Sequence, residues 1–269
     1  MPLSIEAINN VREMRGLPPL TTSATPTAIA PTDSKPLPAV KRQLTAAALT
    51  ERYRPKTLAE VVGQSEAVAV LADYASAPYS ASFLLFGPSG VGKSSAALAL
   101  AADLGCDVAQ GEFGGVHQIA SGEQTAAAVR ALLDTLSLCP FFGSGWRVAI
   151  VNECDRMSPA AETVWLDALE NLPPRCTIIF TTNSVTNLSD RFRDRTEELC
   201  FTGDVSRLKD AIGALLKTIW QSETGQADAP LHKLGAGMVR DGQVSIRRAV
   251  QSLGKILHQG SHETLTYQQ

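Results

Sequence analysis

The sequence predicts an α/β domain built on a five-stranded parallel sheet, followed by a small helical domain. Short apolar runs alternate with helical stretches between residues 51 and 203, and only helical stretches follow from residue 204 onward. Strands that are apolar along their whole length are typical of parallel sheets with helices on both faces. We therefore divide the chain into an N-terminal segment 1–50, an α/β domain 51–203 and a helical domain 204–269.

The expected elements follow one another in strand–helix order. Val148–Val151 is entirely apolar, and the run that starts at Cys176 is rich in β-branched residues, as strands are. The five strands are expected at Ser82–Phe86, Val116–Ala120, Arg147–Asn152, Cys176–Thr181 and Glu197–Phe201. Helices are expected at Lys93–Leu104, Glu123–Leu136, Ser158–Asn171, Val205–Gln221, Pro230–Arg240 and Ser245–His258.

The first 50 residues differ from the rest in composition. Between residues 17 and 45, prolines recur among Thr, Ser and Ala, which removes backbone donors and leaves little apolar surface to bury. We expect a disordered or extended segment, which is either a plain solvated tail or a tether for a partner.

Charge and cysteine usage exclude several classes of protein. The formal net charge is −3, so the chain is not a general nucleic-acid binder, and contact with DNA needs a local patch. No apolar run approaches the roughly 18 residues of a membrane span. The five cysteines form no CxxC pair, which argues against a zinc ribbon and a disulfide framework. We expect a cytoplasmic protein with reduced thiols.

Residues 87–94 match the phosphate-binding pattern G-x-x-x-x-G-K-[ST] between an expected strand and an expected helix. Glycines let backbone N–H groups surround phosphates, and the helix presents its positive end to them. Lys93 is expected to contact the β- and γ-phosphates of ATP, and the Ser94 hydroxyl to bind Mg²⁺. The expected nucleotide-binding residues of this loop are Gly87, Pro88, Ser89, Gly90, Val91, Gly92, Lys93, Ser94 and Ser95.

A P-loop needs a carboxylate site on a neighbouring strand, and the strand that ends at Asn152 supplies one. Glu153 is placed to polarise the attacking water. Asn152 stands where an aspartate usually holds the water shell of Mg²⁺, and its amide brings no negative charge, so we expect weaker Mg²⁺ binding. Asp155 is a nearby metal candidate that compensates for this charge. The alternative is an inactive relic of an ATPase.

Polar residues also end the next expected strand, at Thr181, Thr182 and Asn183. A polar side chain there lies between Glu153 and the γ-phosphate, so Asn183 is a further candidate for the hydrolytic site. Strand ends also carry Thr and Asn for structural reasons, so this assignment depends on the two preceding motifs.

The stretch from Glu51 to Gln64 reads ERYRPKTLAEVVGQ and resembles the nucleotide-binding box ahead of the P-loop in AAA+ ATPases. Within that superfamily, the chain is similar to the clamp-loader branch, the small subunits of replication factor C and their bacterial and phage relatives. The resemblance implies an AAA+ sheet domain followed by a helical lid. It also implies that five residues surround the adenine and ribose, namely Tyr53, Arg54, Pro55, Val61 and Val62.

The same resemblance assigns a role to Arg195. The tripeptide Asp-Arg-Thr at residues 194–196 stands where the family has Ser-Arg-Cys, whose arginine reaches the γ-phosphate bound by the adjacent subunit. A guanidinium supplied in this way stabilises charge in the transition state and can contribute ~10³–10⁵ in rate. Arg191 and Arg193 are close neighbours that are easily confused with it.

A second arginine, Arg247, lies in a stretch that resembles the second sensor of the family's lid, Val244–Val250. There the first arginine points into the nucleotide of its own subunit. Helical periodicity places Ile246 and Ala249 on the packed side of this helix and Arg248 more outward, so we assign the role to Arg247.

Together these residues predict an ATPase that hydrolyses ATP at subunit interfaces to drive DNA-associated assembly remodelling in replication or repair. The resemblance implies a homo- or hetero-oligomer of AAA+ subunits, with a sliding clamp and DNA as possible partners and no membrane. One alternative is an ATP-sensing subunit with weak or no hydrolysis, which Asn152 favours. Another is a branch-migration or helicase-loader ATPase, because clamp-loader subunits normally continue into a third helical domain and only residues 259–269 remain here.

Overall fold

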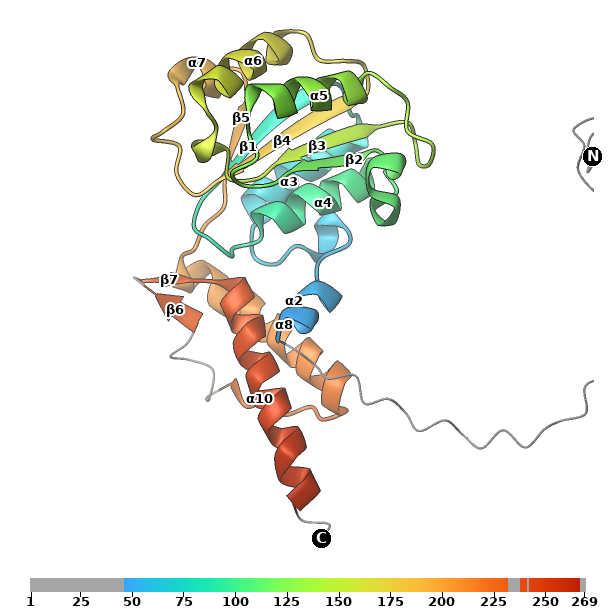
Figure 1. Cartoon of the computed structure of the whole chain (residues 1–269). Helices are drawn as coiled ribbons and strands as arrows, with labels where there is room; N and C mark the ends of the chain where they lie inside the picture. The colour runs from blue at the N-terminus through green and yellow to red at the C-terminus, as the bar shows by residue number, and fades with distance from the viewer. Residues whose placement is uncertain (1–45, 232–237, 241, 267–269) are drawn as a thin grey trace, which may run out of the picture. The chain divides into compact units, whose positions relative to one another are not determined.

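The computed structural model describes residues 46–231, 238–240 and 242–266, and the extended segment expected over residues 17–45 lies outside this part of the chain. The described residues form a parallel sheet with helices on both faces, and a helical part follows it in sequence (Figure 1). The predicted fold class is confirmed. In the described part, no helix is long and apolar enough to cross a membrane.

The sheet has the strand order β2-β3-β4-β1-β5, and every neighbouring pair is parallel. Each strand lies within one residue of its predicted bounds: β1 Ala81–Phe86, β2 Val116–Ile119, β3 Arg147–Val151, β4 Cys176–Thr182 and β5 Glu197–Cys200. Because β1 lies beside β4 and β4 beside β3, the carboxyl ends of these three strands meet at one edge of the sheet.

Successive strand residues face opposite sides of the sheet and build two cores. Phe83 and Leu85 pack in one core with Leu100, whereas Leu84 packs in the other with Trp165. The first core is covered by α3 Ser65–Ser76 and α4 Lys93–Asp103, and the second by α5 Ala126–Leu136, α6 Pro159–Glu170 and α7 Asp190–Arg193 (Figure 1). Three 3-10 helices complete the domain: η1 Leu58–Glu60, η2 Val108–Gly114 and η3 Cys154–Arg156.

The C-terminal helices form a third core that includes a helix from the start of the described chain. This core joins α2 Ala46–Arg52, α8 Val205–Thr224 and α10 Ile246–Thr266. Leu49 of α2 is 1% exposed and packs with residues of α8 and α10. Residues 46–50, which the sequence analysis places in the N-terminal segment 1–50 outside both domains, therefore belong to a packed helix, because Leu49 gains its apolar partners only in the folded chain.

A short hairpin interrupts the C-terminal part, where the sequence predicts only helices. β6 Val239–Arg240 pairs antiparallel with β7 Gln243–Val244, and Gly242 between them has φ 73°. The expected helix Pro230–Arg240 is therefore wrong at its end, and its residues 232–237 lie outside the described part. A glycine with positive φ allows this reversal, and two-residue strands are too short to give a periodic pattern.

Candidate functional site

The P-loop runs from the end of β1 to the start of α4 and depends on glycine at two positions. Gly87 has φ 141°, and a Cβ there would lie 2.0 Å from the carbonyl oxygen of Phe201, just after β5. Gly92 has φ 108° and caps the N-terminus of α4. Glycine adopts these conformations readily, and the helix N-terminus at the end of the loop favours anions.

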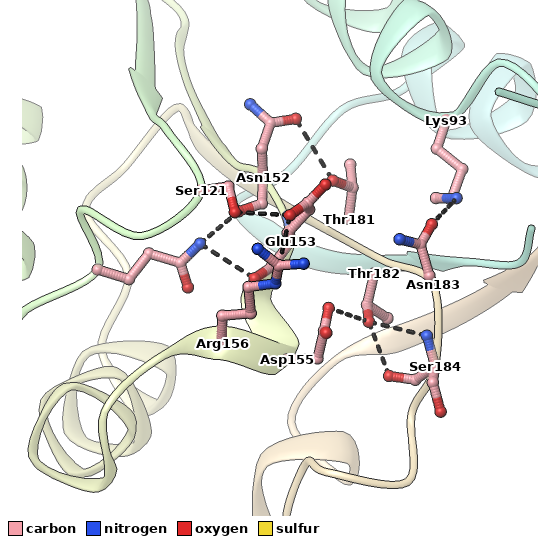
Figure 2. Close-up of polar contacts among 11 residues, drawn as sticks. Lys93, Ser121, Asn152, Glu153, Asp155, Arg156, Thr181, Thr182, Asn183 and Ser184 are labelled. Carbon is pink, nitrogen blue, oxygen red and sulfur yellow. Dashed lines mark hydrogen bonds and ion pairs between the residues drawn. The ribbon is translucent and has the colours of Figure 1, made fainter. Parts of the chain in front are cut away.

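Lys93 is the first residue of α4 and is 8% exposed. Its Nζ donates hydrogen bonds to the carbonyl oxygens of Gly87 at 2.6 Å and Pro88 at 2.7 Å, and to Asn183 Oδ1 at 3.1 Å (Figure 2). Burial, and next the positive charge of Arg247, lower the pKa of Lys93 to about 8. A bound anion would oppose both effects, so this lysine is suited to contact phosphate.

Asn152, directly after β3, connects the P-loop to β4. Its Oδ1 accepts hydrogen bonds from the Ser94 hydroxyl at 3.0 Å and the Thr181 hydroxyl at 3.3 Å. Figure 2 shows Asn152 and Thr181 together at the strand ends, with Asn183 reaching toward Lys93. The structure thus brings together Ser94 and Asn152, two of the three predicted metal residues.

Glu153 has a left-handed backbone, with φ 53° and ψ 54°. Residues with a side chain rarely adopt this conformation, which tends to persist at functional sites. Its carboxylate accepts a hydrogen bond from the Ser121 hydroxyl at 2.6 Å and lies 3.5 Å from Arg156 Nε (Figure 2). The carboxylate is therefore held by a hydroxyl and a cation at the carboxyl edge of the sheet.

The loop between β2 and α5 supplies two contacts to Glu153 that sequence reasoning missed. One is the Ser121 hydroxyl, and the other is the side chain of Gln124, which is 3% exposed. Gln124 Nε2 donates hydrogen bonds to the carbonyl oxygens of Asn152 and, at 3.2 Å, of Glu153. Their place just after the carboxyl end of a parallel strand is the signal that could have found them.

A cavity of about 300 Å³ joins these groups, at the small end of the range for ligand pockets. The predicted nucleotide-binding residues that line it are Tyr53, Arg54, Pro55, Val61, Val62, Ser89, Gly90, Val91, Gly92, Lys93, Ser94 and Ser95. The predicted catalytic and metal residues in its lining are Asn152, Glu153, Asn183 and Arg247. Lining residues that were not predicted are Thr50, Glu60, Ser121, Thr181, Thr182, Leu215, Ile246 and Val250. Four predicted residues lie outside the lining: Gly87, Pro88, Asp155 and Arg195.

Part of the cavity wall is apolar and comes from separate elements. Val61 and Val62 follow η1, Leu215 belongs to α8, and Ile246 and Val250 belong to α10. A wall of this kind suits the faces of a nucleotide base. Leu215 has no sequence signal of its own, because its position in the site depends on how α8 packs.

The residues at the end of α2 are anchored to α8. The Tyr53 hydroxyl donates a hydrogen bond to Glu223 Oε1 at 2.9 Å, and Arg54 pairs with Glu51 at 2.8 Å. Burial, and next the bond to Glu223, raise the pKa of Tyr53. This side of the cavity is therefore built jointly by α2 and the C-terminal helices.

Arg247 lines the cavity from the first turn of α10. Its backbone N–H donates to the Gly90 carbonyl oxygen at 3.1 Å, and the Ser245 hydroxyl donates to the same oxygen at 3.4 Å. The start of this helix therefore touches the P-loop backbone directly, which brings the Arg247 side chain into the same cavity as Lys93.

Arg195 lies away from the cavity, two residues before β5 begins at Glu197. The Ser82 hydroxyl, near the start of β1, donates a hydrogen bond to the Arg195 carbonyl oxygen at 2.6 Å. The P-loop follows the opposite end of β1, so Arg195 lies at the amino edge of the sheet and the cavity at its carboxyl edge.

The donors available for a metal are few. Asp155 is outside the lining, and its carboxylate accepts a hydrogen bond from the Thr182 hydroxyl at 2.7 Å (Figure 2). Among the described residues, no group of three His, Cys, Asp or Glu side chains is placed to hold a metal ion. Ser94 and Asn152 offer oxygen donors, which suit Mg²⁺ when waters and substrate phosphates complete its shell. The site therefore fits Mg²⁺ bound with a nucleotide but contributes little negative charge.

The chain is similar in sequence to subunits of DNA polymerase III and of replication factor C. The sequence profile described as "DNA polymerase III, delta subunit" matches residues 63–204, more than half of the chain. The replication factor C large subunit of Methanosarcina mazei is 28% identical over 68% of this chain and 29% of its own length. The replication factor C small subunit of Archaeoglobus fulgidus is 30% identical over 54% of this chain and 45% of its own length. The chain thus spans less than half the length of these two relatives.

A solved structure shares the fold. The Holliday junction branch migration motor RuvB of Thermotoga maritima superposes with a TM-score of 0.57 over 80% of this chain and 67% of its own, at 20% identity. At that identity the likeness concerns the fold alone.

Proposed function

The chain belongs to the DNA polymerase III delta subunit family, and from that premise we propose that it hydrolyses ATP at subunit interfaces to drive remodelling of a DNA-associated assembly. It is an AAA+ protein of the clamp-loader-like class. The observation that carries the proposal is the cavity that joins Lys93 of the P-loop, Glu153 at a strand end and Arg247 of α10.

Binding uses positive charge at one part of the cavity and apolar surface at another. Lys93 and the P-loop backbone bind the phosphates, and Arg247 adds a second cation from α10. The base packs on the apolar wall around Val61 and Val62. Burial, and next the positive charge of Arg247, lower the pKa of Lys93, and a bound polyphosphate opposes both effects.

Hydrolysis follows from the residues at the strand ends. Glu153 takes a proton from a water whose oxygen attacks the γ-phosphorus, while the bond to the β–γ bridging oxygen breaks and ADP leaves. Asn183 orients that water beside Lys93, and Arg195 of a neighbouring copy neutralises the charge that develops on the phosphoryl group. Ser94 and Asn152 would hold Mg²⁺, which would neutralise part of the phosphate charge.

An exposed apolar patch supports a protein partner. Phe113, Phe141 and Phe142 are 52–81% exposed, and the ring centroids of Phe113 and Phe141 lie 6.0 Å apart. The N–H groups of Phe141 and Phe142 both donate to the Phe113 carbonyl oxygen, which holds the patch together. Exposed aromatic clusters of this kind mark protein contacts. We assign the patch to a sliding clamp, which the complex would place on DNA.

Replacing Phe141 and Phe142 with serine should abolish binding to the cognate clamp and leave nucleotide affinity unchanged. Val70, a single exposed apolar residue of α3, gives the control variant Val70→Ser. Clamp binding that survives the double substitution would remove the patch from the proposal.

A second candidate is an ATP-sensing subunit that binds ATP but hydrolyses it poorly. The observation in its favour is Asn152, a neutral residue that accepts the Ser94 hydrogen bond at 3.0 Å. In that case ATP would switch assembly without being consumed.

Phosphate release by the purified protein separates the candidates. An active ATPase should release phosphate faster with primed DNA and clamp, and Lys93→Ala should lower nucleotide binding at least about tenfold. Tight ATP binding without phosphate release would favour the ATP-sensing role. Stimulation only by a four-way junction would favour branch migration.

A further inference from the structure

Arg195 has a backbone fixed to the core of the α/β domain. Its carbonyl oxygen accepts the Ser82 hydrogen bond at 2.6 Å, and its N–H donates to the Phe192 carbonyl oxygen at 3.2 Å. Phe192 is fully buried, and its ring centroid lies 4.8 Å from that of Phe180. The Arg195 side chain therefore starts from a rigid position.

The Arg195 guanidinium is held by Glu170, the last residue of α6. Its Nε donates to Glu170 Oε1 at 3.1 Å, Nη2 donates to the same oxygen, and Nη1 donates to the Arg191 carbonyl oxygen at 2.8 Å. A guanidinium carries five N–H donors, so these bonds leave one N–H on each terminal nitrogen for another acceptor. The side chain is 31% exposed, so that acceptor can come from another molecule.

Arg193, the neighbour most easily confused with Arg195, is held differently. Its Nε and Nη2 bond both carboxylate oxygens of Glu198, at 2.6 Å and 3.2 Å, and Asp190 lies 3.9 Å from Nη1. Carboxylates therefore flank this guanidinium on both sides, and their negative charge repels an incoming phosphate. Among the residues that the structure describes, Arg195 forms an ion pair with one carboxylate, that of Glu170.

We propose that Glu170 is a positioning residue for Arg195. It holds the Nε side of the guanidinium and leaves the remaining N–H groups for the γ-phosphate bound by a neighbouring copy. This role rests on the proposed function, in which Arg195 acts across a subunit interface. An exposed ion pair contributes little to stability. The contribution of Glu170 therefore lies in the orientation of the Arg195 guanidinium, and reaction rates are sensitive to such orientation.

Glu170→Gln keeps the size of the side chain and removes its charge. We expect kcat to fall about tenfold with KM and nucleotide affinity unchanged, because Glu170 lies outside the cavity. The matched control is Glu66→Gln, which removes another exposed ion pair, with Arg207 at 3.2 Å, and should leave kcat as it is.

Mixed oligomers distinguish positioning from general damage. Glu170→Gln mixed with Glu153→Gln contains interfaces in which Glu153, Arg195 and Glu170 are all intact, so activity should return. Glu170→Gln mixed with Arg195→Ala contains no interface with an intact Arg195–Glu170 pair, so activity should stay low. Recovery in this second mixture, or a Glu170→Gln variant as active as the parent or more so, would overturn the positioning role.

Mixing Glu153→Gln with Arg195→Ala tests the proposed function separately. No recovery in oligomers that demonstrably co-assemble would defeat the shared site, and the role of Glu170 with it. Recovery there, together with full activity of Glu170→Gln, would defeat the role of Glu170 alone.

Discussion

Two of the cations that line the cavity, Lys93 and Arg247, lack a direct anionic partner in the described part of the chain. Lys93 donates only to two backbone carbonyls and the Asn183 amide, and Arg247 contributes its positive charge to the same space. Like charges in a partly buried cavity disfavour one another until an anion binds. The site is therefore arranged for phosphate before any ligand arrives, and its affinity should depend on the protonation of Lys93.

ATP affinity should fall about tenfold between pH 7 and pH 9. The pKa of Lys93 is lowered from 10.5 to about 8, so the free protein loses this charge as the pH rises through 8, whereas bound phosphate favours the charged form. Calorimetric titration with ATP at both pH values measures the change. Lys93→Arg is the control, because a guanidinium does not titrate in this range. An equal fall in that variant would assign the effect to another group.

Asn152→Asp should lower the Mg²⁺ concentration at half-maximal ATPase activity about tenfold. An aspartate has the shape of Asn152 and can still accept the Ser94 and Thr181 hydrogen bonds, and it adds a negative charge directly beside Ser94. Titration of Mg²⁺ at saturating ATP measures the midpoint, with Asn152→Ala as the variant that loses the acceptor. An unchanged midpoint would mean that another group, such as Asp155, already supplies the charge.

At the scale of elements, the sequence predicts those features that depend on the residues of a single segment. The three central strands β1, β3 and β4 are found within one residue, because they are buried and mostly apolar along their length. The edge strands β2 and β5, which carry polar residues, are found equally closely. The ends of β3 and β4 deliver Asn152, Glu153 and Asn183 to one cavity, as strand order requires. The contacts of Ser121 and Gln124 to Glu153 escape prediction, because they exist only after β2 lies beside β3.

Alanine should destabilise the P-loop more at Gly87 than at Gly92. Gly87→Ala should destabilise the protein by about 3 kcal/mol, because the new Cβ would lie 2.0 Å from a backbone oxygen. Gly92→Ala should lower the free energy of unfolding by about 1–2 kcal/mol. The new Cβ would meet no atom within 4 Å, so the loss comes only from the positive φ of the backbone. Urea unfolding without nucleotide compares the two. Equal losses would mean that the loop shifts freely away from β5.

At the scale of the whole molecule, the proposed function requires one copy to supply parts of two different sites. The carboxyl edge of its sheet holds the cavity with Lys93 and Glu153, and the amino edge holds Arg195 with its partner Glu170. Strands of this sheet are four to seven residues long, so the two edges are roughly 15–20 Å apart. Arg195 therefore cannot reach the phosphates of its own cavity without a large rearrangement.

ATPase activity per chain should consequently rise with protein concentration, while ATP binding per chain stays constant. In the proposed function, binding uses residues of one copy and hydrolysis needs Arg195 from a second, and the population of assembled copies follows mass action. Phosphate release measured over a thousandfold dilution series, beside ATP binding on the same samples, checks this. Arg195→Ala should bind ATP normally and show low activity at every concentration. Constant activity per chain across the series, in samples that demonstrably dissociate, would mean that each copy hydrolyses ATP alone.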